Sequence, residues 1–396
     1  MFDITIEQPT LMKALEYLEP TVGKNASGLG DNCVSMRTTG NGSVEMYTTN
    51  TIECTVVEAI VAMGGGSVEQ CPYVDFKRLK SIVASIPENE VISLKAAVNN
   101  VMLNFGRQAK PMTIVGGNNG MIPLPTNTFG STASIPKTLV KDALNRVCAI
   151  VSDTSSSPIY NCIRFYTDKT NVEITALDVN CKRTFVQFGQ STSNNPTQEI
   201  LVEASKLKKS MRLFEDFNEM DFSMDTYMIL VEASDPVSQY AMKTKGMISG
   251  IKYYCRRLTG AFPANIAQNF YPQPHEFIEV NRQEMLDCFS RVRAIEDQTS
   301  ANLIDFEAAG TGVKVVMNTT LGNIEEQVSA VNALTTSFKT VFKYPNISDI
   351  LKTMDSPTFE IGILPNHPMN YVVRSPQNTQ VLFTVPSMIG ATGATP

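Results

Sequence analysis

Residues 67–83 read SVEQCPYVDFKRLKSIV, in which a β-prone segment and a polar turn are followed by an amphipathic helical pattern. When that helix is drawn at about 100° per residue, its large apolar side chains share one side: Phe76, Leu79, Ile82, Val83 and Ile86. Its basic side chains fall on the other side: Lys77, Arg78 and Lys80. The stretch predicts a strand, a turn and a helix with one apolar and one basic face.

The same pattern occurs at five further places, and successive openings lie 61 to 78 residues apart. These openings are DITIEQPTLMKALEYL (3–18), STASIPKTLVKDALNRV (131–147), QEILVEASKLKKSMRLF (198–214), EFIEVNRQEMLDCFSRV (276–292) and SFKTVFKYPNISDILKTM (337–354). A regular period over a whole chain is typical of one structural unit used repeatedly. We therefore look for function in the surface that the six copies form together.

The segments between the helical patterns predict strands, for example SVEMYTT (43–49) and NVEITALD (171–178). One helix with about three strands gives too few crossovers for a doubly wound parallel sheet. We therefore expect an α+β fold with antiparallel meanders and two repeats in each of three similar domains. Linker-like composition around 125–131 and 271–276 places these domains at 1–128, 129–273 and 274–390, followed by a flexible tail at 391–396.

Composition limits the class of protein before any site is considered. Of the 396 residues, 43% are hydrophobic, enough to build packed cores. The net charge of −6 argues against a generic nucleic-acid binder, so any basic surface must be local. Eight scattered cysteines without a Cys-x-x-Cys pair indicate reduced core thiols. With no signal-peptide or membrane-span pattern, we expect a cytoplasmic protein with no membrane partner.

The residue types that catalysis needs are scarce. Only His275 and His367 are present, so the sequence predicts no histidine metal site and no nucleophile–base pair. The glycines at 64–66 precede a strand and are expected to form a turn rather than a phosphate-binding loop. Glu325 and Glu326 could bind a metal in principle, but adjacent acids on a strand edge are far more often solvated. We predict no catalytic residue, no metal and no cofactor, and hence no enzyme.

Six segments, in order along the chain, resemble the bacterial DNA polymerase III beta subunit, the DNA sliding clamp. They are YVDFKRLKSIVASIPENEVISL (73–94), SSPIYNCIRFYTD (156–168), EITALDVNCKRTF (173–185), RRLTGAFPANI (256–266), VNRQEMLDCFSRVRAI (280–295) and VLFTVPSMI (381–389). The resemblance extends from end to end of the chain and agrees with the repeat read independently of it.

The resemblance implies a clamp fold that closes as a head-to-tail homodimeric ring, with twelve helices facing the hole and continuous sheet outside. Double-stranded DNA passes through such a ring without sequence recognition, because basic side chains attract phosphates but read no bases. The candidate DNA-binding residues are Lys24, Lys77, Arg78, Lys80, Lys137, Lys141, Lys208, Lys209, Arg282 and Lys352. For any single helix, the alternative is an ordinary solvated face.

In that family, the replicative polymerase and the clamp loader dock short peptide motifs in a pocket between the second and third domains. The corresponding residues are Tyr160, Leu177, Val179, Asn180, Pro263, Ala267, Val385, Pro386, Ser387 and Met388. Leu177 and Val179 replace the threonine and glycine usual in the family, and Arg183 is displaced by about two residues. We expect an apolar pocket with an altered motif preference; the alternative is that these residues only seal the joint between domains.

Ring closure in the family joins the first domain of one chain to the third domain of the other. By family position, the edge strand at 110–115 should meet the region of Ile295, and the candidate interface residues are Met112, Thr113, Ile114 and Ile295. The alternative for Ile295 is core packing at a helix end. The departures from the family pattern suit a phage-encoded member, which would act in the host cytoplasm.

Two rival functions come from other classes. One is a non-enzymatic structural or assembly protein with repeated β-rich domains, in which the basic helices would be incidental. The other is an enzyme that uses carboxylates and a metal, for which the sequence offers no supporting spacing.

Overall fold

A computed structural model of the chain describes most of its residues. The described residues are 2–23, 32–50, 52–64, 66–107, 110–117, 124, 128–147, 149–151, 157–178, 183–233, 248–258, 260–263, 274, 276–296, 302–364 and 367–388. The chain divides into two compact units. The first comprises Met1–Thr138, Ser191–Ile200 and Lys206–Arg257, and the second comprises Leu139–Gln190, Leu201–Ser205 and Leu258–Pro396. The three-domain boundaries therefore stay a prediction, since each unit holds part of the expected middle domain.

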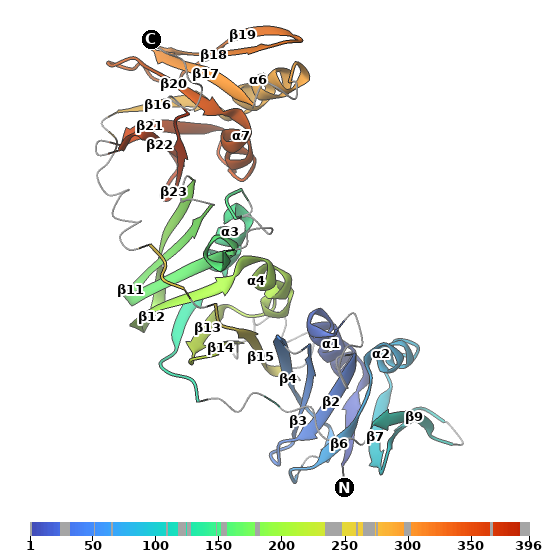
Figure 1. Ribbon diagram of the computed structural model, residues 1–396. Coiled ribbons are helices and arrows are strands. Elements are labelled where there is room, and N and C mark those ends of the chain that lie inside the picture. The colour runs from blue at the N-terminus through green and yellow to red at the C-terminus, as the bar shows by residue number, and fades with distance from the viewer. Residues whose placement is uncertain are drawn as a thin grey trace. The chain divides into compact units, whose positions relative to one another are not determined.

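All six predicted helices are present (Figure 1). They are α1 (Gln8–Leu18), α2 (Phe76–Ala84), α3 (Lys137–Val147), α4 (Ala204–Ser210), α6 (Arg282–Ala294) and α7 (Tyr344–Lys352). The expected polar turn before each helix is absent, because every helix begins at the residue after its strand. At α2 and α6 the capping residue makes the change of direction: the side chains of Asp75 and Asn281 accept hydrogen bonds from the amides of Arg78 and Glu284, as N-caps do.

The strands of the first unit form one thirteen-stranded sheet. Its order is β10 (Ala133–Pro136), β13 (Glu219–Met224), β14 (Met228–Ala233), β15 (Ile248–Arg256), β4 (Glu53–Ile60), β3 (Ser43–Thr49), β2 (Cys33–Thr38), β6 (Gln70–Asp75), β9 (Met112–Gly117), β8 (Asn100–Asn104), β7 (Val91–Ala97), β1 (Asp3–Glu7) and β5 (Met63–Gly64). The strand pairs are antiparallel, for example β4 with β15 and β8 with β9, as the sequence predicted.

The second unit contains two sheets. The six-stranded sheet runs β11 (Cys162–Leu177), β12 (Thr184–Glu203), β23 (Asn378–Pro386), β22 (His367–Ser375), β21 (Thr358–Leu364) and β16 (Phe277–Asn281). The four-stranded sheet runs β19 (Gly322–Ser329), β18 (Gly312–Thr319), β17 (Leu303–Ala309) and β20 (Phe338–Lys343). The rings of Phe342 and Tyr371 pack edge to face, with centroids 5.0 Å apart, and so connect the two sheets.

β11 is a hairpin rather than one extended strand. The guanidinium of Arg164 lies 2.5 Å from the carboxylate of Glu173. Nine residues of straight strand would span about 30 Å, so the chain must reverse between them. The reversal falls at Lys169, whose φ of 52° lies in the left-handed region typical of tight turns. If the two-residue β5 and the strand that leads into each helix are left aside, each of the six helices is followed by three strands or strand segments. We call each helix with the three strands that follow it a repeat, and number the repeats 1 to 6 in chain order.

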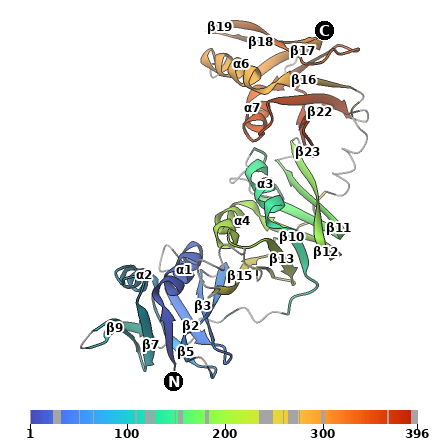
Figure 2. The ribbon, with the colours of Figure 1, turned by 180° about the vertical axis from the view of Figure 1, so that it is seen from behind.

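Alternation along the strands separates the helix side of the first sheet from its other side. Val44, Met46 and Val57 are fully buried, and Thr48, which has the same parity as Val44 and Met46, donates a hydrogen bond to the carbonyl of Leu18 at the end of α1. Within this unit α1 and α2 lie side by side (Figures 1 and 2), and the side-chain amide of Gln8 in α1 donates to the carbonyl of Val83 in α2. The buried core therefore lies between the sheet and its helices.

Candidate nucleic-acid interface and peptide pocket

The helix faces turned away from the core carry exposed cations. In α2, Phe76, Leu79 and Val83 are buried, whereas Lys77 and Arg78 are exposed. In α4, Leu207 is buried, whereas Lys208 and Lys209 are exposed. The α-helix ends earlier than the pattern predicted, at Ser210, and the chain continues as a 3-10 turn over Met211–Phe214 that still buries Phe214. Lys141 of α3 is also exposed.

Several other predicted cations have partners within the fold. Lys80 lies 2.9 Å from the carboxylate of Glu19 in the first unit. Lys352 lies 3.1 Å from Asp349 on the same helix, and the ammonium of Lys137 donates to the carbonyl of Glu215 at 2.6 Å. Such pairing lowers the charge that a helix face presents to a polyanion. Lys24 lies outside the described residues.

The side chain of Arg282 donates hydrogen bonds to backbone carbonyls within the fold. Its Nε donates to the carbonyl of Ser356 at 2.9 Å, and its Nη1 donates to the carbonyl of Leu351 at 3.2 Å. Leu351 lies in the last turn of α7, where carbonyls have no partner within the helix and favour a cation. The guanidinium therefore ties α6 to the C-terminal end of α7.

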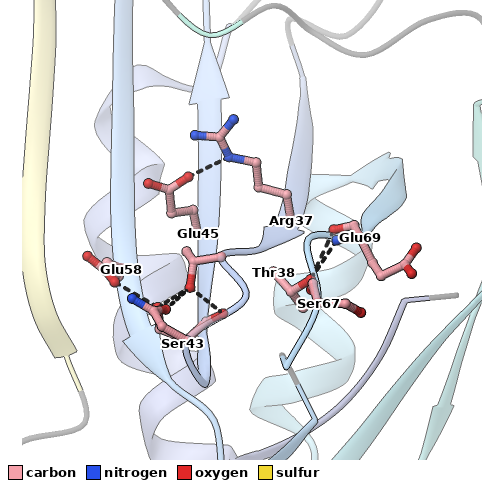
Figure 3. Close-up of polar contacts among 9 residues, drawn as sticks. Arg37, Thr38, Ser43, Glu45, Glu58, Ser67 and Glu69 are labelled. Atoms are coloured by element: carbon pink, nitrogen blue, oxygen red, sulfur yellow. Dashed lines mark hydrogen bonds and ion pairs between the residues drawn. The ribbon is translucent and has the colours of Figure 1, made fainter.

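Carboxylates gather on the other side of the first sheet. Glu45, Glu58, Asp221 and Glu232 line a hollow of about 270 Å³ where β4 meets β15. The guanidinium of Arg37 lies 2.5 Å from the carboxylate of Glu45, and the hydroxyl of Ser43 donates to Glu58 (Figure 3). Burial raises the pKa of the Asp221 carboxyl, the Ser134 hydroxyl opposes that shift, and Glu219 and Glu232 add to it. Four carboxylates therefore meet in this hollow, together with the ammonium of Lys252, which lies 3.2 Å from Glu232.

Two of the predicted pocket residues, Leu177 and Tyr160, belong to one apolar cluster of the second unit. Leu177 is fully buried against Phe262, with the half-buried Tyr160 packed on them. Ile159, Leu258 and Phe262 belong to the same cluster and were missed by sequence reasoning, although Phe262 directly precedes the predicted Pro263. Because Leu177 has no exposed surface, it cannot form a wall of the predicted pocket.

Arg183 closes the turn beside this cluster. Its Nε donates to the carboxylate of Asp178 at 3.0 Å, and its Nη1 donates to the carbonyl of Ala149 at 2.9 Å. The guanidinium of Arg183 therefore satisfies acceptors within its own turn and its neighbourhood. The predicted residues Val179, Asn180 and Ala267 lie outside the described residues.

The end of β23 lies beside the same turn. β12 pairs with β23 through Thr184 and Thr384, so the register brings Val385 opposite Arg183. Val385 is buried, whereas Pro386, Ser387 and Met388 are partly exposed. The amides of Ser387 and Met388 donate to the carbonyls of Met369 and Val341, which fix the course of the chain there. Tyr160, Leu177 and the end of β23 thus lie near the place where β12 meets β23, which we call the second joint.

The predicted edge at 110–115 is a strand edge over part of its length. Met112–Val115 pair only with β8 among the described strands, whereas β6 meets only Gly116 and Gly117. Met112, Thr113 and Val115 are exposed, but Ile114 is buried in its own unit. The side chain of Ile114 therefore packs into the core of its own unit and anchors the strand there.

Ile295 is half-buried at the C-terminal end of α6, and its carbonyl accepts the Thr319 hydroxyl at 2.9 Å. Thr319 ends β18, and β19 follows as the outermost strand of the four-stranded sheet. Glu326 on β19 accepts two bonds of 2.5 Å from Arg291, which lower the pKa of its carboxyl. Glu325 lies 2.8 Å from Lys314. No set of three or more acidic, histidine or cysteine side chains suited to a metal occurs among the described residues.

The pairing between repeats follows a rule. The third strand of repeat 1, β4, pairs with the third strand of repeat 4, β15. The third strand segment of repeat 3, in β12, pairs with the third strand of repeat 6, β23. Each such strand therefore pairs with its counterpart three repeats further on. Repeats 2 and 5 end in β9 and β19, which have no such partner among the described strands.

This fold is that of the bacterial DNA polymerase sliding clamps. The beta subunit of DNA polymerase from Streptococcus pyogenes matches with a TM-score of 0.79 at 14% identity, covering 98% of this chain and 99% of that chain. A DNA polymerase sliding clamp from Pseudomonas aeruginosa gives the same TM-score, identity and coverage. A DNA polymerase III beta chain from Streptococcus pneumoniae matches with a TM-score of 0.77 at 15% identity, covering 98% and 99%. No family model matches the sequence, and no curated protein matches it.

Among the residues that the structure describes, no helix is both long and apolar enough to span a membrane. The predicted resemblance and the α+β antiparallel fold class are thus confirmed at the level of the fold.

Proposed function

We propose that this protein is a DNA sliding clamp, a processivity factor that encircles duplex DNA and holds a replicative polymerase on it. The observation that carries the proposal is the likeness of fold to sliding clamps over 98% of the chain. The activity is mechanical, because a topological link to DNA requires no bond to be made or broken by the clamp itself. The protein would act in the cytoplasm, or in the host cytoplasm if a phage encodes it.

The DNA-facing surface consists of the exposed helix cations. Lys77, Arg78, Lys141 and Lys209 are the strongest candidates, because their side chains are exposed on helices that carry an apolar face toward the core. Lys80, Lys137, Lys352 and Arg282 contribute less, since each already binds an acceptor in the fold. Lysine and arginine attract phosphates regardless of base sequence, which permits sliding. The carboxylates on the outer face of the first sheet repel phosphates, so DNA binding is disfavoured on that face.

Ring closure follows from extending the pairing rule beyond the end of the chain. The third strand three repeats after β19 would belong to repeat 2 of a second copy, which is β9. A second chain offers its own β19 to the open β9 of the first, so two chains satisfy both edges. A head-to-tail homodimer of twelve repeats leaves no third strand unpaired.

Carrying over the register of β4 with β15 gives the contact across this interface. Val115 pairs with the first residue of β8 as Arg256 pairs with the first residue of β14, so Met112 corresponds to Tyr253. Tyr253 pairs with Thr55, the third residue of β4, and the third residue of β19 is Ile324. Met112 therefore lies opposite Ile324 of the partner subunit, as Phe185 contacts Phe383 within the chain.

The partner pocket is formed by Tyr160, Pro263, Pro386, Ser387 and Met388 above the buried Leu177. The polymerase and the clamp loader would insert the apolar anchors of a short linear motif there. Because Arg183 is occupied by Asp178, we expect the pocket to favour motifs that depend on apolar anchors rather than on an acidic residue.

Primer extension by the cognate polymerase on a primed circular template tests the proposal, with loader and ATP present. We expect much longer products per binding event when this protein is added. A Met388→Ala variant should lose most of that gain, because it removes an apolar wall without opening the core. Products of unchanged length with a cognate polymerase and loader would overturn the proposal and favour the structural or assembly role.

A further inference from the structure

Large exposed hydrophobic side chains recur in the hairpin turns of the repeats. Ile52 lies in the turn of repeat 1, Val98 in repeat 2, Tyr227 in repeat 4 and Leu321 in repeat 5, with 44, 79, 74 and 69% of their surfaces exposed. Turns are normally built from small and polar residues. The recurrence of an exposed apolar side chain in this position points to contact with another molecule.

Two of these side chains flank one strand end in the first unit. The amide of Arg256 at the end of β15 donates to the carbonyl of Ile52 at 3.1 Å, and the amide of Arg257 donates to the carbonyl of Tyr227 at 2.8 Å. β15 lies between β14 and β4 in the sheet. The backbones of Ile52 and Tyr227 are therefore about two strand spacings apart, roughly 10 Å. We call the place where β4 meets β15 the first joint, and we call Ile52, Tyr227, Arg256 and Arg257 the first-joint patch.

The patch is positively charged. Arg256 is exposed, and no side chain in the described part of the chain pairs with it. Arg257 donates one bond, from Nη1 to the carbonyl of Asp225 at 2.9 Å, and keeps its other donors. A carboxylate oxygen of Asp225 is engaged by the amides of Tyr227 and Met228, each at 2.6 Å. The patch thus combines two apolar side chains with two guanidinium groups.

The first-joint patch lies at the end of β15, and the candidate pocket lies at the corresponding place in the second joint, at the end of β23. At the end of β23, the amide of Ser387 donates to the carbonyl of Met369, just as Arg257 donates to Tyr227. Met369 is also an exposed large hydrophobic residue, at 45%. The two joints differ in their chemistry, because arginines stand at the end of β15 where Pro386 and Ser387 stand at the end of β23.

We propose that the first-joint patch is a second docking surface, for an acidic linear peptide that carries an aromatic or aliphatic anchor. The anchor packs between Ile52 and Tyr227, and its carboxylates pair with Arg256 and Arg257. This surface lies in a different joint from the partner pocket. It therefore goes beyond the clamp function and does not depend on it.

The test uses fluorescence anisotropy with the full-length protein and a labelled eight-residue peptide, with Leu-Phe at its centre and Asp or Glu elsewhere. We expect saturable binding that a Tyr227→Ser/Arg256→Glu variant weakens at least tenfold, which corresponds to about 1.4 kcal/mol. The Met388→Ala variant, altered only in the partner pocket, should bind within twofold of the unaltered protein. Because both substituted patch residues are exposed, the variant should keep the unaltered melting temperature.

Two control peptides make the outcome decisive. A peptide with Ala-Ala at the centre should bind weakly, since it lacks the anchor, and one with lysines in place of the acids should not bind. No saturable binding, equal binding of the lysine peptide, or loss of binding only in Met388→Ala would overturn the proposal.

Discussion

Lys77 and Lys80 stand three residues apart on α2, yet they differ in what they can offer to DNA. Lys77 is exposed, while Lys80 lies 2.9 Å from Glu19 at the end of the neighbouring helical segment. A cation that already has a carboxylate partner releases fewer counterions when a phosphate approaches. The charge of a helix face therefore depends on neighbours that the helix sequence does not contain.

Reversing the charge of Lys77 and Arg78 together should weaken direct DNA association and flatten its dependence on salt. A Lys77→Glu/Arg78→Glu variant removes two phosphate contacts, so the slope of log K against log salt should fall by roughly 2. Lys80→Ser is the matched control on the same helix and should change the slope much less. Fluorescence titration of a duplex oligonucleotide at several salt concentrations measures both, and equal effects of the two variants would contradict the assignment.

The buried cysteine thiols should be unreactive. The six described cysteines are all buried, and burial raises the pKa of Cys54 and Cys71 to about 12. With eight cysteines in the chain, no more than two should react with Ellman's reagent in the native protein, and all eight should react in guanidinium. Three or more fast-reacting thiols under native conditions would mean that one of these cores is open.

At the residue scale, the sequence predicted which faces of the helices are buried but not how the cations are used. Arg282 follows the helical pattern well, yet it binds the carbonyls of Leu351 and Ser356, some 70 residues further on. Leu177 was expected to form a pocket wall and is instead fully buried. Both outcomes depend on contacts between distant segments, which periodicity does not encode.

At the scale of single elements, one glycine fixes the short strand that caps the first sheet. Gly64 in β5 has a φ of 91°, and a Cβ there would overlap the carbonyl oxygen of Asp3 on β1. Gly64→Ala should therefore destabilise the protein by about 1–3 kcal/mol. Gly66→Ala is the control, because a Cβ there meets nothing within 4 Å. Denaturant unfolding measures both variants, and equal stability would contradict this account of the strand.

Helices and strands were predictable because each repeat carries its own signal. The alternation of Phe76, Leu79 and Val83 with lysines predicts α2 from local pattern alone. The turn expected before each helix was wrong, because one capping residue, such as Asp75 or Asn281, is enough to redirect the chain. The pairing of β4 with β15 is not encoded locally, since almost 200 residues separate the strands.

At the scale of the whole molecule, Met112–Val115 of β9 and the outermost strand β19 lack a second partner among the described strands, and these two edges predict a specific dimer. The carried-over register puts Thr113 opposite Asn323 of the partner subunit, in the place of Tyr254 and Cys54 within the chain. Both residues are exposed, and directly opposed side chains lie about 5 Å apart. A Thr113→Cys/Asn323→Cys variant should therefore give a cross-linked dimer with a short bis-maleimide.

The variants with Thr113→Cys alone and Asn323→Cys alone are the controls for this cross-link and should remain monomeric on a denaturing gel. Light scattering of the unmodified protein should give twice the 43.5 kDa mass of one chain. Higher oligomers, growing with concentration, would contradict closure and indicate an open head-to-tail assembly.

The central claim is that the protein encircles DNA, and the cross-linked ring tests it most directly. The Thr113→Cys/Asn323→Cys variant is incubated with nicked circular DNA, cross-linked and then denatured with detergent. We predict that cross-linked protein stays with the circular DNA and is released once a restriction enzyme makes the DNA linear. Cross-linked dimers that leave circular DNA in detergent, or that remain on linear DNA, would contradict the account.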